Sequence, residues 1–339
     1  MEIIAEIGKN FVVTKEPEEL DVLIERAKEL ITEAKRAGCD VAKFQVHCVE
    51  DEIHPEAKII SPHFDHDRFE WVKRNSYEAS FWMKIADYCR EVGIEFLATP
   101  MSRGAAILLD VIGVDSWKIG SGDILDFVML DYIRDTGKPV ILSSGMSSLE
   151  ELKLAYEYLK EKINDVSILH CVSQYPCPLS SLNLGTIPFL KKQFPEATIG
   201  FSDHSLGIEG SLMAVKLGAK IIEKHFSFDR EAWGPDHKVS MLPKEMKLLT
   251  ESIYNNITMI PSKEAFGVET KFIQEGEEKF RGAFRKGLYA SRDIQEGEIM
   301  EPDMVYAMRP TAGALPSENY PTLMRMKAIK NYKQYEKIS

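Results

Sequence analysis

Short apolar runs of this 339-residue chain repeatedly end in polar or ionisable side chains that can move protons, hold a metal ion or bind an anion. In chain order, the residues at these ends are Glu6; Lys43 and Gln45; Thr99; Lys118, Ser121 and Asp123; Ser143 and Ser144; His170, Ser173 and Tyr175; Ser202, Asp203 and His204; and Glu223 and His225. If the runs are parallel strands of one barrel, these ends open onto one mouth, where polar groups can converge on a ligand. The pattern therefore predicts a single shared site.

Two lysines of this set stand inside apolar runs, Lys43 in VAKFQV and Lys118 in SWKIGSG. A buried ammonium needs an anionic partner, so each lysine either forms a salt bridge alone or serves a ligand. Together with the hydroxyls and backbone amides of the GSG segment, the lysines are suited to a phosphate and carboxylate cradle. This cradle does not have the sequence of a Walker loop.

Two histidines, His204 and His225, end consecutive runs. Neighbouring strands lie about 5 Å apart, so both imidazoles could bind one divalent ion and leave positions open for substrate and water. An isolated histidine pair is more often structural, but the convergent setting favours a metal site. The loop SPHFDHD also has the composition of a metal cluster, with His63, Asp65, His66 and Asp67, but it is interpreted as a polar insertion because we expect no strand to hold these side chains in place.

The runs predict eight strands with amphipathic helices between them, several ending at a glycine such as Gly93 or Gly113. The expected strands are 2–7, 40–46, 94–98, 116–119, 139–142, 166–170, 197–200 and 219–225. Eight strand–helix units in about 250 residues are typical of an α/β protein of the (β/α)8 TIM-barrel class. A doubly wound open sheet is the competing fold, although no GxGxxG follows the first strand.

Beyond the last predicted strand the pattern changes. We expect a catalytic barrel over 1–265, a linker over 266–283 and a small domain over 284–339, with the insertion 47–77 as a candidate lid. The tail 284–339 carries 9 basic and 7 acidic residues, whereas the preceding body carries 33 and 46. These opposite net charges permit docking of the tail on the body.

Composition excludes several classes of protein. The 42 basic and 53 acidic residues give a net charge of −11, which argues against nucleic-acid binding, and the 44% hydrophobic content excludes general disorder. No apolar run of membrane-spanning length or signal peptide is evident, so we expect a cytoplasmic protein without membrane contact. The five cysteines (Cys39, Cys48, Cys89, Cys171 and Cys177) are expected to be reduced thiols.

In these residues the sequence resembles the sialic acid synthase family, which comprises the N-acetylneuraminate, legionaminic acid and pseudaminic acid synthases. The matching motifs are AEIGKN at 5–10, AKFQ at 42–45, VEDE at 49–52, ATP at 98–100, KIGSGD at 118–123, LSSGM at 142–146, LHC at 169–171, QYP at 174–176, GFSDHSLG at 200–207, EKHF at 223–226 and GPDHKVS at 234–240. The tail segments 285–298 and 307–313 resemble the small antifreeze-like (SAF) domain that closes these enzymes. The resemblance covers nearly the whole chain.

The resemblance implies a transferase that condenses phosphoenolpyruvate with an N-acylated hexosamine and water to give a nine-carbon α-keto acid and phosphate. The sugar would be N-acetylmannosamine or a 2,4-diacetamido-trideoxyhexose, and His204 and His225 would hold Mn²⁺ or Mg²⁺. Positions matching phosphoenolpyruvate ligands are Lys43, Thr99, Lys118, Ser121, Ser143 and Ser202, with Ser173 where relatives often have a phosphate-binding Asn. Sugar-side positions are Glu6, Gln45, Tyr175 and Asp236.

Among these residues, the catalytic set is expected to be Asp123, Glu6, Lys118 and Glu223, with Asp123 acting as the base for water or orienting the sugar. Arg309 matches an arginine that reaches from the tail of one subunit into the barrel of the other and would bind the N-acyl group of the sugar there, which implies a domain-swapped homodimer. The segment 10–13 (NFVV) departs from the family's Asn-His-(Asn/Glu)-Gly, a change in the substrate shell.

Two other functions remain open from the sequence. The barrel would also suit an aldolase that forms a Schiff base through Lys118 or Lys43. A non-catalytic protein that binds a glycan or ice through its tail is the second alternative, although it leaves the lysines and histidines at the strand ends without a role.

Overall fold

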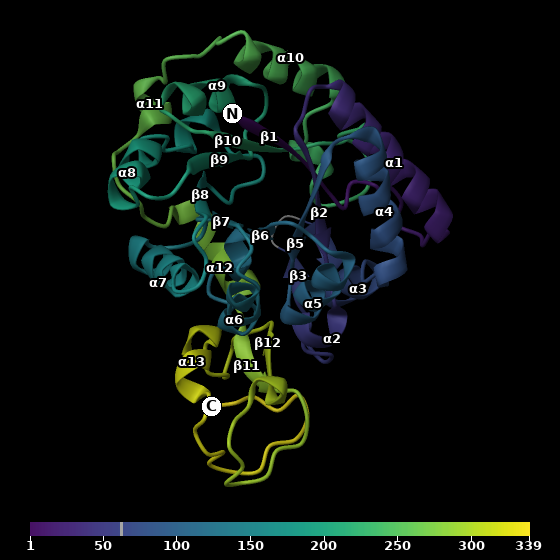
Figure 1. Ribbon diagram of the computed structural model, residues 1–339, viewed down its shortest axis with the longest axis vertical. Coiled ribbons are helices and arrows are strands. Elements are labelled where there is room, and N and C mark those ends of the chain that lie inside the picture. The colour runs from purple at the N-terminus through teal and green to yellow at the C-terminus, as the bar shows by residue number, and fades with distance from the viewer. Residues whose placement is uncertain (62–63) are drawn as a thin grey trace.

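The computed structural model describes residues 1–61 and 64–339, together with the side chains outside 61–65 (Figure 1). The interpretation of the SPHFDHD loop as a polar insertion falls partly on His63 and Asp65, which lie outside the described residues and side chains. No helix in the described ranges is both long and apolar enough to cross a membrane.

Eight parallel strands form a nearly closed barrel within the described part of the chain. The strands are β1 (Glu2–Gly8), β2 (Val41–Val46), β5 (Glu95–Pro100), β6 (Trp117–Ile119), β7 (Val140–Ser143), β8 (Val166–Cys171), β9 (Ile199–Asp203) and β10 (Ile221–His225). Hydrogen-bonded neighbours follow the order β5-β2-β1-β10-β9-β8-β7-β6, and β6 returns into contact with β5. The predicted barrel is confirmed and the open doubly wound sheet is wrong, because the two outer strands lie against each other.

Helices surround this barrel (Figure 1). Those of the barrel body are α1 (Leu20–Arg36), α4 (Ala79–Val92), α5 (Arg103–Ile112), α6 (Phe127–Thr136), α7 (Leu149–Lys160), α8 (Thr186–Gln193), α9 (Glu209–Lys216), α10 (Pro243–Tyr254) and α11 (Lys263–Phe266). Helices α4 and α5 end as predicted at Gly93 and Gly113, which adopt the left-handed conformation that a glycine tolerates best. The side chain of Ser102 caps the start of α5 by accepting a hydrogen bond from the Ala105 amide.

The amino end of the barrel interior is filled by an apolar layer. Ile4, Val41, Leu97, Leu169 and Ile221 form this cluster, and all five are buried. Each of the five comes from a different strand and precedes the polar residues at that strand's carboxyl end. The layer closes the bottom of the barrel, so a ligand can enter from the carboxyl ends alone.

The insertion after β2 contains ordered elements. These are α2 (Val49–Glu52), the antiparallel strands β3 (Ile60–Ser61) and β4 (Phe64–Asp67), and α3 (Arg68–Arg74). The Asp67 side chain caps α3 by accepting hydrogen bonds from the amides of Phe69 and Glu70. This cap fixes the first residue of α3, Arg68, beside the barrel mouth.

The tail follows α12 (Glu278–Phe284) and contains the antiparallel pair β11 (Gly287–Ala290) and β12 (Val305–Met308) with α13 (Tyr320–Leu323). Figure 1 shows it as a yellow unit below the barrel, next to α2, α5 and α6. Arg309 pairs with Ile53 in a parallel bridge, and Ser317 Oγ donates to the Leu125 carbonyl at 2.7 Å. The tail therefore docks on the barrel of its own chain, whereas the domain boundaries and the SAF assignment stay predictions.

Gly200 of β9 has no room for a side chain. A Cβ atom there would lie 2.5 Å from Leu169 Cδ2 and 2.6 Å from the Ile221 carbonyl oxygen. We expect Gly200→Ala to lower the free energy of unfolding by about 1–3 kcal/mol in urea denaturation, because the barrel layer must shift. Gly282→Ala is the control, since nothing lies within 4 Å of its added Cβ and the helix should gain stability. Equal effects of both changes would contradict this account of the interior.

Candidate active site

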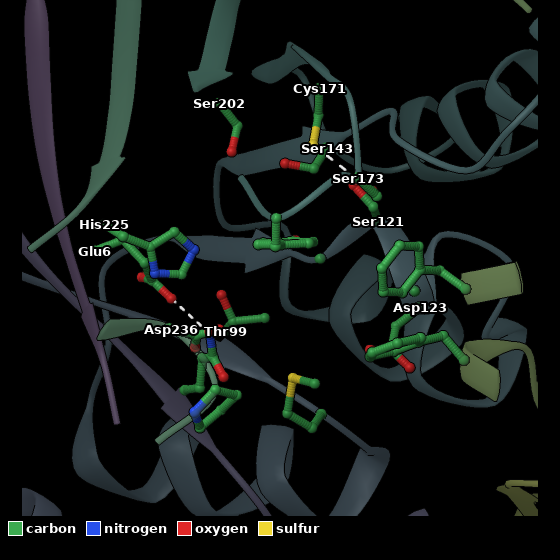
Figure 2. A pocket seen from close by; sticks show the side chains of 18 of the residues that line it. Glu6, Thr99, Ser121, Asp123, Ser143, Cys171, Ser173, Ser202, His225 and Asp236 are labelled. Carbon is green, nitrogen blue, oxygen red and sulfur yellow. Dashed lines mark hydrogen bonds between the residues drawn. The ribbon is translucent and has the colours of Figure 1, made fainter. Parts of the chain in front are cut away.

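A cavity of about 150 Å³ opens at the carboxyl ends of the strands (Figure 2). It brings together the predicted residues Glu6, Lys43, Gln45, Thr99, Lys118, Ser121, Asp123, Ser143, Ser173, Tyr175, Ser202, His204, Glu223, His225 and Asp236. Arg309 alone of the predicted site residues does not line it. Convergence of these side chains on one cavity is what the strand-end pattern predicted, while their individual roles stay predictions.

Two other strand-end residues belong to the structure behind the cavity. His170 stacks on Phe201, and its Nε2 lies 2.7 Å from the Leu182 carbonyl oxygen. Asp203 forms a buried ion pair with Lys224 at 3.0 Å. These contacts account for both ionisable groups without a ligand.

The floor of the cavity is a buried array of two lysines and two glutamates. Lys43 Nζ lies 2.5 Å from Glu6 and 3.4 Å from Glu223, and Lys118 Nζ lies 3.7 Å from Glu223. Hydroxyl groups complete the array, because Lys43 donates to Thr99, Lys118 donates to Ser143 and Ser202 donates to Glu223. The sequence left salt bridge and ligand cradle as alternatives for these lysines; the salt bridges are present, and the cradle stays a prediction.

The two lysines of this array keep the carboxylate of Glu223 charged. Burial would raise the pKa of Glu223, but the charges of Lys118 and Lys43 outweigh it and lower that pKa to about 2. Burial likewise opposes the charge of Lys43, whereas Glu223 and Glu6 raise its pKa above the ordinary value. The pKa of Lys118 is lowered by burial and by the neighbouring Lys43. An anionic ligand would therefore offset the repulsion between the two ammonium groups.

The two histidines expected to hold a metal face each other. The ring centroids of His204 and His225 are 5.4 Å apart, and Tyr175 lies over His204 at 4.2 Å. Burial lowers the pKa of both histidines, which favours the neutral form that a metal requires. The Val172 carbonyl holds His204 Nδ1 at 3.0 Å, and His225 Nδ1 is buried without a hydrogen-bond partner. This pair is suited to a divalent ion, although no group of three or more potential ligands occurs among the described residues.

A hydrogen-bonded chain extends from this floor toward the insertion. Gln45 donates to Glu6 at 2.8 Å and accepts from Lys9 Nζ at 2.7 Å. Lys9 Nζ also lies 2.7 Å from His47 Nε2, and His47 Nδ1 lies 2.6 Å from Glu52. Sequence reasoning missed Lys9, His47 and Glu52, although Lys9 stands in the AEIGKN motif and Glu52 in VEDE.

Arg309 lies behind the cavity wall and not within it. Its side chain is fully buried and donates to Asp123 at 2.6 Å, to Glu52 at 3.2 Å and to the Phe284 carbonyl at 2.8 Å. Lys286 adds a second cation at 2.9 Å from Asp123. Within this chain two buried carboxylates bind its guanidinium, and the contact from Arg309 to the sugar stays a prediction.

Comparison with known proteins identifies the family of this chain. The family model described as "NeuB family" matches residues 30–265, which is well over half of the chain. The chain belongs to the NeuB family. Its family relatives include the N,N'-diacetyllegionaminic acid synthase of Campylobacter jejuni, which is 33% identical over 92% of this chain and 93% of that protein.

Two further NeuB-family relatives cover most of the chain. The N-acetylneuraminate-9-phosphate synthase of Homo sapiens is 34% identical, with 89% of this chain and 81% of that protein covered. Among solved structures, the spore coat polysaccharide biosynthesis protein SpsE of Bacillus subtilis is 30% identical, with a TM-score of 0.81 over 100% of this chain and 93% of that chain. The resemblance inferred from the motifs is thereby confirmed.

The role of Glu223 in this floor can be measured as stability. Glu223→Gln leaves Lys43 and Lys118 with fewer opposing charges in a buried site, so we expect a loss of about 3–5 kcal/mol in the free energy of unfolding. The measurement is urea denaturation at pH 7 followed by circular dichroism. Glu231→Gln, on an exposed residue, is the control and should change stability little. A loss below 1 kcal/mol at Glu223 would mean that the lysines are not held as described.

Proposed function

We propose that this protein is a nonulosonic acid synthase. It condenses phosphoenolpyruvate with an N-acylated hexosamine and water to give a nine-carbon α-keto acid and phosphate, with N-acetylmannosamine or a 2,4-diacetamido-trideoxyhexose as the sugar. The single observation that carries the proposal is the cavity in which the two-lysine floor and the neutral histidine pair lie together. Membership of a family whose relatives include legionaminic, neuraminate and pseudaminic acid synthases supports it.

Binding of phosphoenolpyruvate falls to the cations and hydroxyls of the floor. Lys43 and Lys118 oppose the charge of the phosphate and carboxylate, and Thr99, Ser121, Ser143, Ser173 and Ser202 supply hydroxyl donors from neighbouring strands. The Gly145 amide already donates to Ser121 Oγ at 3.0 Å, which orients that hydroxyl toward the ligand. Several strands thus contribute one donor each, so the cradle is rigid before the substrate arrives.

The reaction joins the methylene carbon of phosphoenolpyruvate to the aldehyde carbon of the open-chain sugar, and the aldehyde oxygen takes a proton to become a hydroxyl. Cationic character then develops at the central carbon of the former enol, where the carboxylates of Glu223 and Glu6 lie nearby to stabilise it. Water adds to that carbon and loses a proton. The tetrahedral intermediate expels phosphate by cleavage of its carbon–oxygen bond, which leaves the ketone.

Of the two roles expected for Asp123, we propose that it orients the sugar. Its Oδ1 atom is held by both Arg309 and Lys286. Its Oδ2 atom is buried without a hydrogen-bond partner at the cavity wall (Figure 2). We assign this atom to a sugar hydroxyl, with Gln45, Tyr175 and Asp236 as further sugar contacts.

His204 and His225 are the residues that would hold Mn²⁺ or Mg²⁺. The orphaned Nδ1 of His225 and the fixed ring of His204 support this assignment. When bound, the ion polarises the aldehyde oxygen as a Lewis acid. The histidines contribute neutral imidazoles from adjacent strands, and Tyr175 covers the ring of His204.

We further propose a cytoplasmic homodimer in which the tails are exchanged between subunits. The contacts of Arg309 with Glu52 and Asp123 join the tail to the barrel mouth, so the same contacts would form across subunits after an exchange. Small-molecule substrates are its proposed partners.

Consumption of phosphoenolpyruvate tests the reaction. We expect phosphate release only when an amino sugar is present, loss of activity in EDTA and recovery with Mn²⁺, because the histidine pair needs an ion to act. A panel of N-acetylmannosamine and the two diacetamido-trideoxy sugars identifies the acceptor. Borohydride should trap no covalent adduct by mass spectrometry. An adduct at Lys118 or Lys43 with full activity in EDTA would instead establish the Schiff-base aldolase.

Replacement of Arg309 tests the link between tail and site. Arg309→Ala frees Glu52 and Asp123 on the sugar side, so we expect the Michaelis constant for the sugar to rise about tenfold or more and that for phosphoenolpyruvate far less. Steady-state kinetics with each substrate varied in turn measures both constants. Arg292→Ala, at a partly exposed tail arginine, is the control. Equal increases in the two constants would show that Arg309 does not act on the sugar side.

A further inference from the structure

The segment that joins the barrel to the tail also binds two loops of the cavity, and the proposed reaction leaves these contacts without a task. We call residues 274–285, which include α12, the strap. In Figure 1, α12 lies near β7, and it contacts the short turn Ser121–Asp123 that follows β6. The sequence predicts only a linker over most of this segment, so its contacts go beyond that expectation.

Glu277 of the strap is a buried carboxylate that binds backbone amides. Its side chain is 1% exposed, and its Oε1 atom accepts hydrogen bonds from the Met146 amide at 2.8 Å and the Ser173 amide at 2.9 Å. Its Oε2 atom accepts from the Gln274 amide at 3.0 Å, which fixes the carboxylate within the strap. Hydrogen bonds from N–H groups to a charged acceptor belong to the strong class. One side chain outside the strands therefore joins the loop after β7 to the loop after β8.

Met146 has a backbone conformation that needs support. Its φ is +52°, in the left-handed region that residues with a Cβ atom rarely occupy. The strap binds both of its backbone polar groups, because the amide donates to Glu277 and the carbonyl accepts from Arg281 and Arg285, each at 2.6 Å. Arg285 also donates to the Ser121 carbonyl at 3.2 Å. Strained conformations of this kind persist where the surroundings over-determine them, and they are frequent at ligand sites.

The turn bound in this way lies against the hydroxyls of the proposed phosphate cradle. Gly145 precedes Met146, and a Cβ atom on Gly145 would lie 2.7 Å from Ser121 Oγ and closer still to Ser173 Oγ. The Gly145 amide donates to Ser121 Oγ, and both serines line the cavity with Ser143 (Figure 2). A change in the conformation of Met146 would move Gly145 and displace both hydroxyls.

We propose that Glu277 is a positioning residue for phosphoenolpyruvate. It stabilises the left-handed conformation of Met146 and fixes the loop of Ser173, so that the hydroxyls of Ser121 and Ser173 face the phosphate group before it binds. Glu277 itself does not line the cavity and acts through these loops. This inference rests on the proposed function, since it concerns the phosphate side of the same cavity.

Steady-state kinetics of phosphoenolpyruvate consumption with Mn²⁺ tests the role. Glu277→Ala leaves the amides of Met146 and Ser173 without their acceptor, so we expect the Michaelis constant for phosphoenolpyruvate to rise about tenfold or more at saturating sugar. The Michaelis constant for the sugar, at saturating phosphoenolpyruvate, should change far less. Glu277→Gln should restore much of the affinity, because its carboxamide oxygen still accepts from both amides. Glu278→Ala, at an exposed neighbour, is the matched control.

A purely structural role predicts a different result, because loss of folded protein lowers kcat and leaves both Michaelis constants unchanged. Arg285→Gln is a milder variant with the same expected split, since Arg281 still binds the Met146 carbonyl. Equal rises in the two Michaelis constants, a fall in kcat alone or no recovery in Glu277→Gln would overturn the positioning role.

A double-mutant cycle tests whether the carboxylate acts through Met146. Glycine adopts a positive φ without strain, so the turn needs less support in the Met146→Gly background. We expect the rise in the Michaelis constant for phosphoenolpyruvate caused by Glu277→Ala to be about threefold smaller in that background than in the parent chain. An equal rise in both backgrounds would contradict the proposed action through Met146.

Hydrogen exchange separates failure of this role from failure of the proposed reaction. Mass spectrometry of the full chain without substrate follows the peptides that contain the amides of Met146 and Ser173. We expect faster exchange in Glu277→Ala and the parent rates in Glu278→Ala, because only the first variant removes the acceptor. Faster exchange in a chain that turns over no sugar would support the role of Glu277 in holding both loops and would contradict the synthase reaction alone. Unchanged exchange would overturn the role of Glu277 whatever the activity.

Discussion

The site depends on one constraint: the ammonium groups of two lysines are buried close together. Lys43 and Lys118 come from β2 and β6, and Glu223 of β10 lies within 4 Å of both ammonium groups. Strands distant in sequence can supply these three side chains to one point because the parallel sheet curves back on itself. Closure of the barrel and the charge balance of the floor therefore support each other, and the floor remains receptive to an anion.

The tail extends the same charge balance outward. Asp123 and Glu52 are carboxylates that the barrel and its insertion bury at the mouth, and Arg309 and Lys286 of the tail segment neutralise them. Docking of the tail is thus tied to the charge of these two carboxylates at the mouth of the cavity. The basic tail and acidic body noticed in the sequence acquire a physical meaning here, because specific buried pairs join them.

The composition of the site was largely predictable, since apolar strands that end in polar residues have few places to put those residues other than a barrel mouth. Strand positions from β1 to β10 follow from β-branched runs, and fifteen of the sixteen predicted site residues line one cavity. Lys9 and Arg68 were missed because loop and insertion residues carry no period that reveals their orientation. Arg309 was predicted as a sugar contact, and its position behind Asp123 depends on where the tail docks.

By itself, the sequence determined the alternation of strands and helices, the amino acids at the carboxyl ends of the strands and the family motifs, because these properties depend on residues near one another in the chain. Tertiary structure alone decided which charges meet. Glu52 lies 257 positions from Arg309, and Lys43 meets a glutamate 180 positions away, so neither pairing can be read from local pattern. The strength of a buried charge depends on the partners that folding places beside it, which is why the balance of Lys43 and Lys118 against Glu6 and Glu223 exists only in the folded chain.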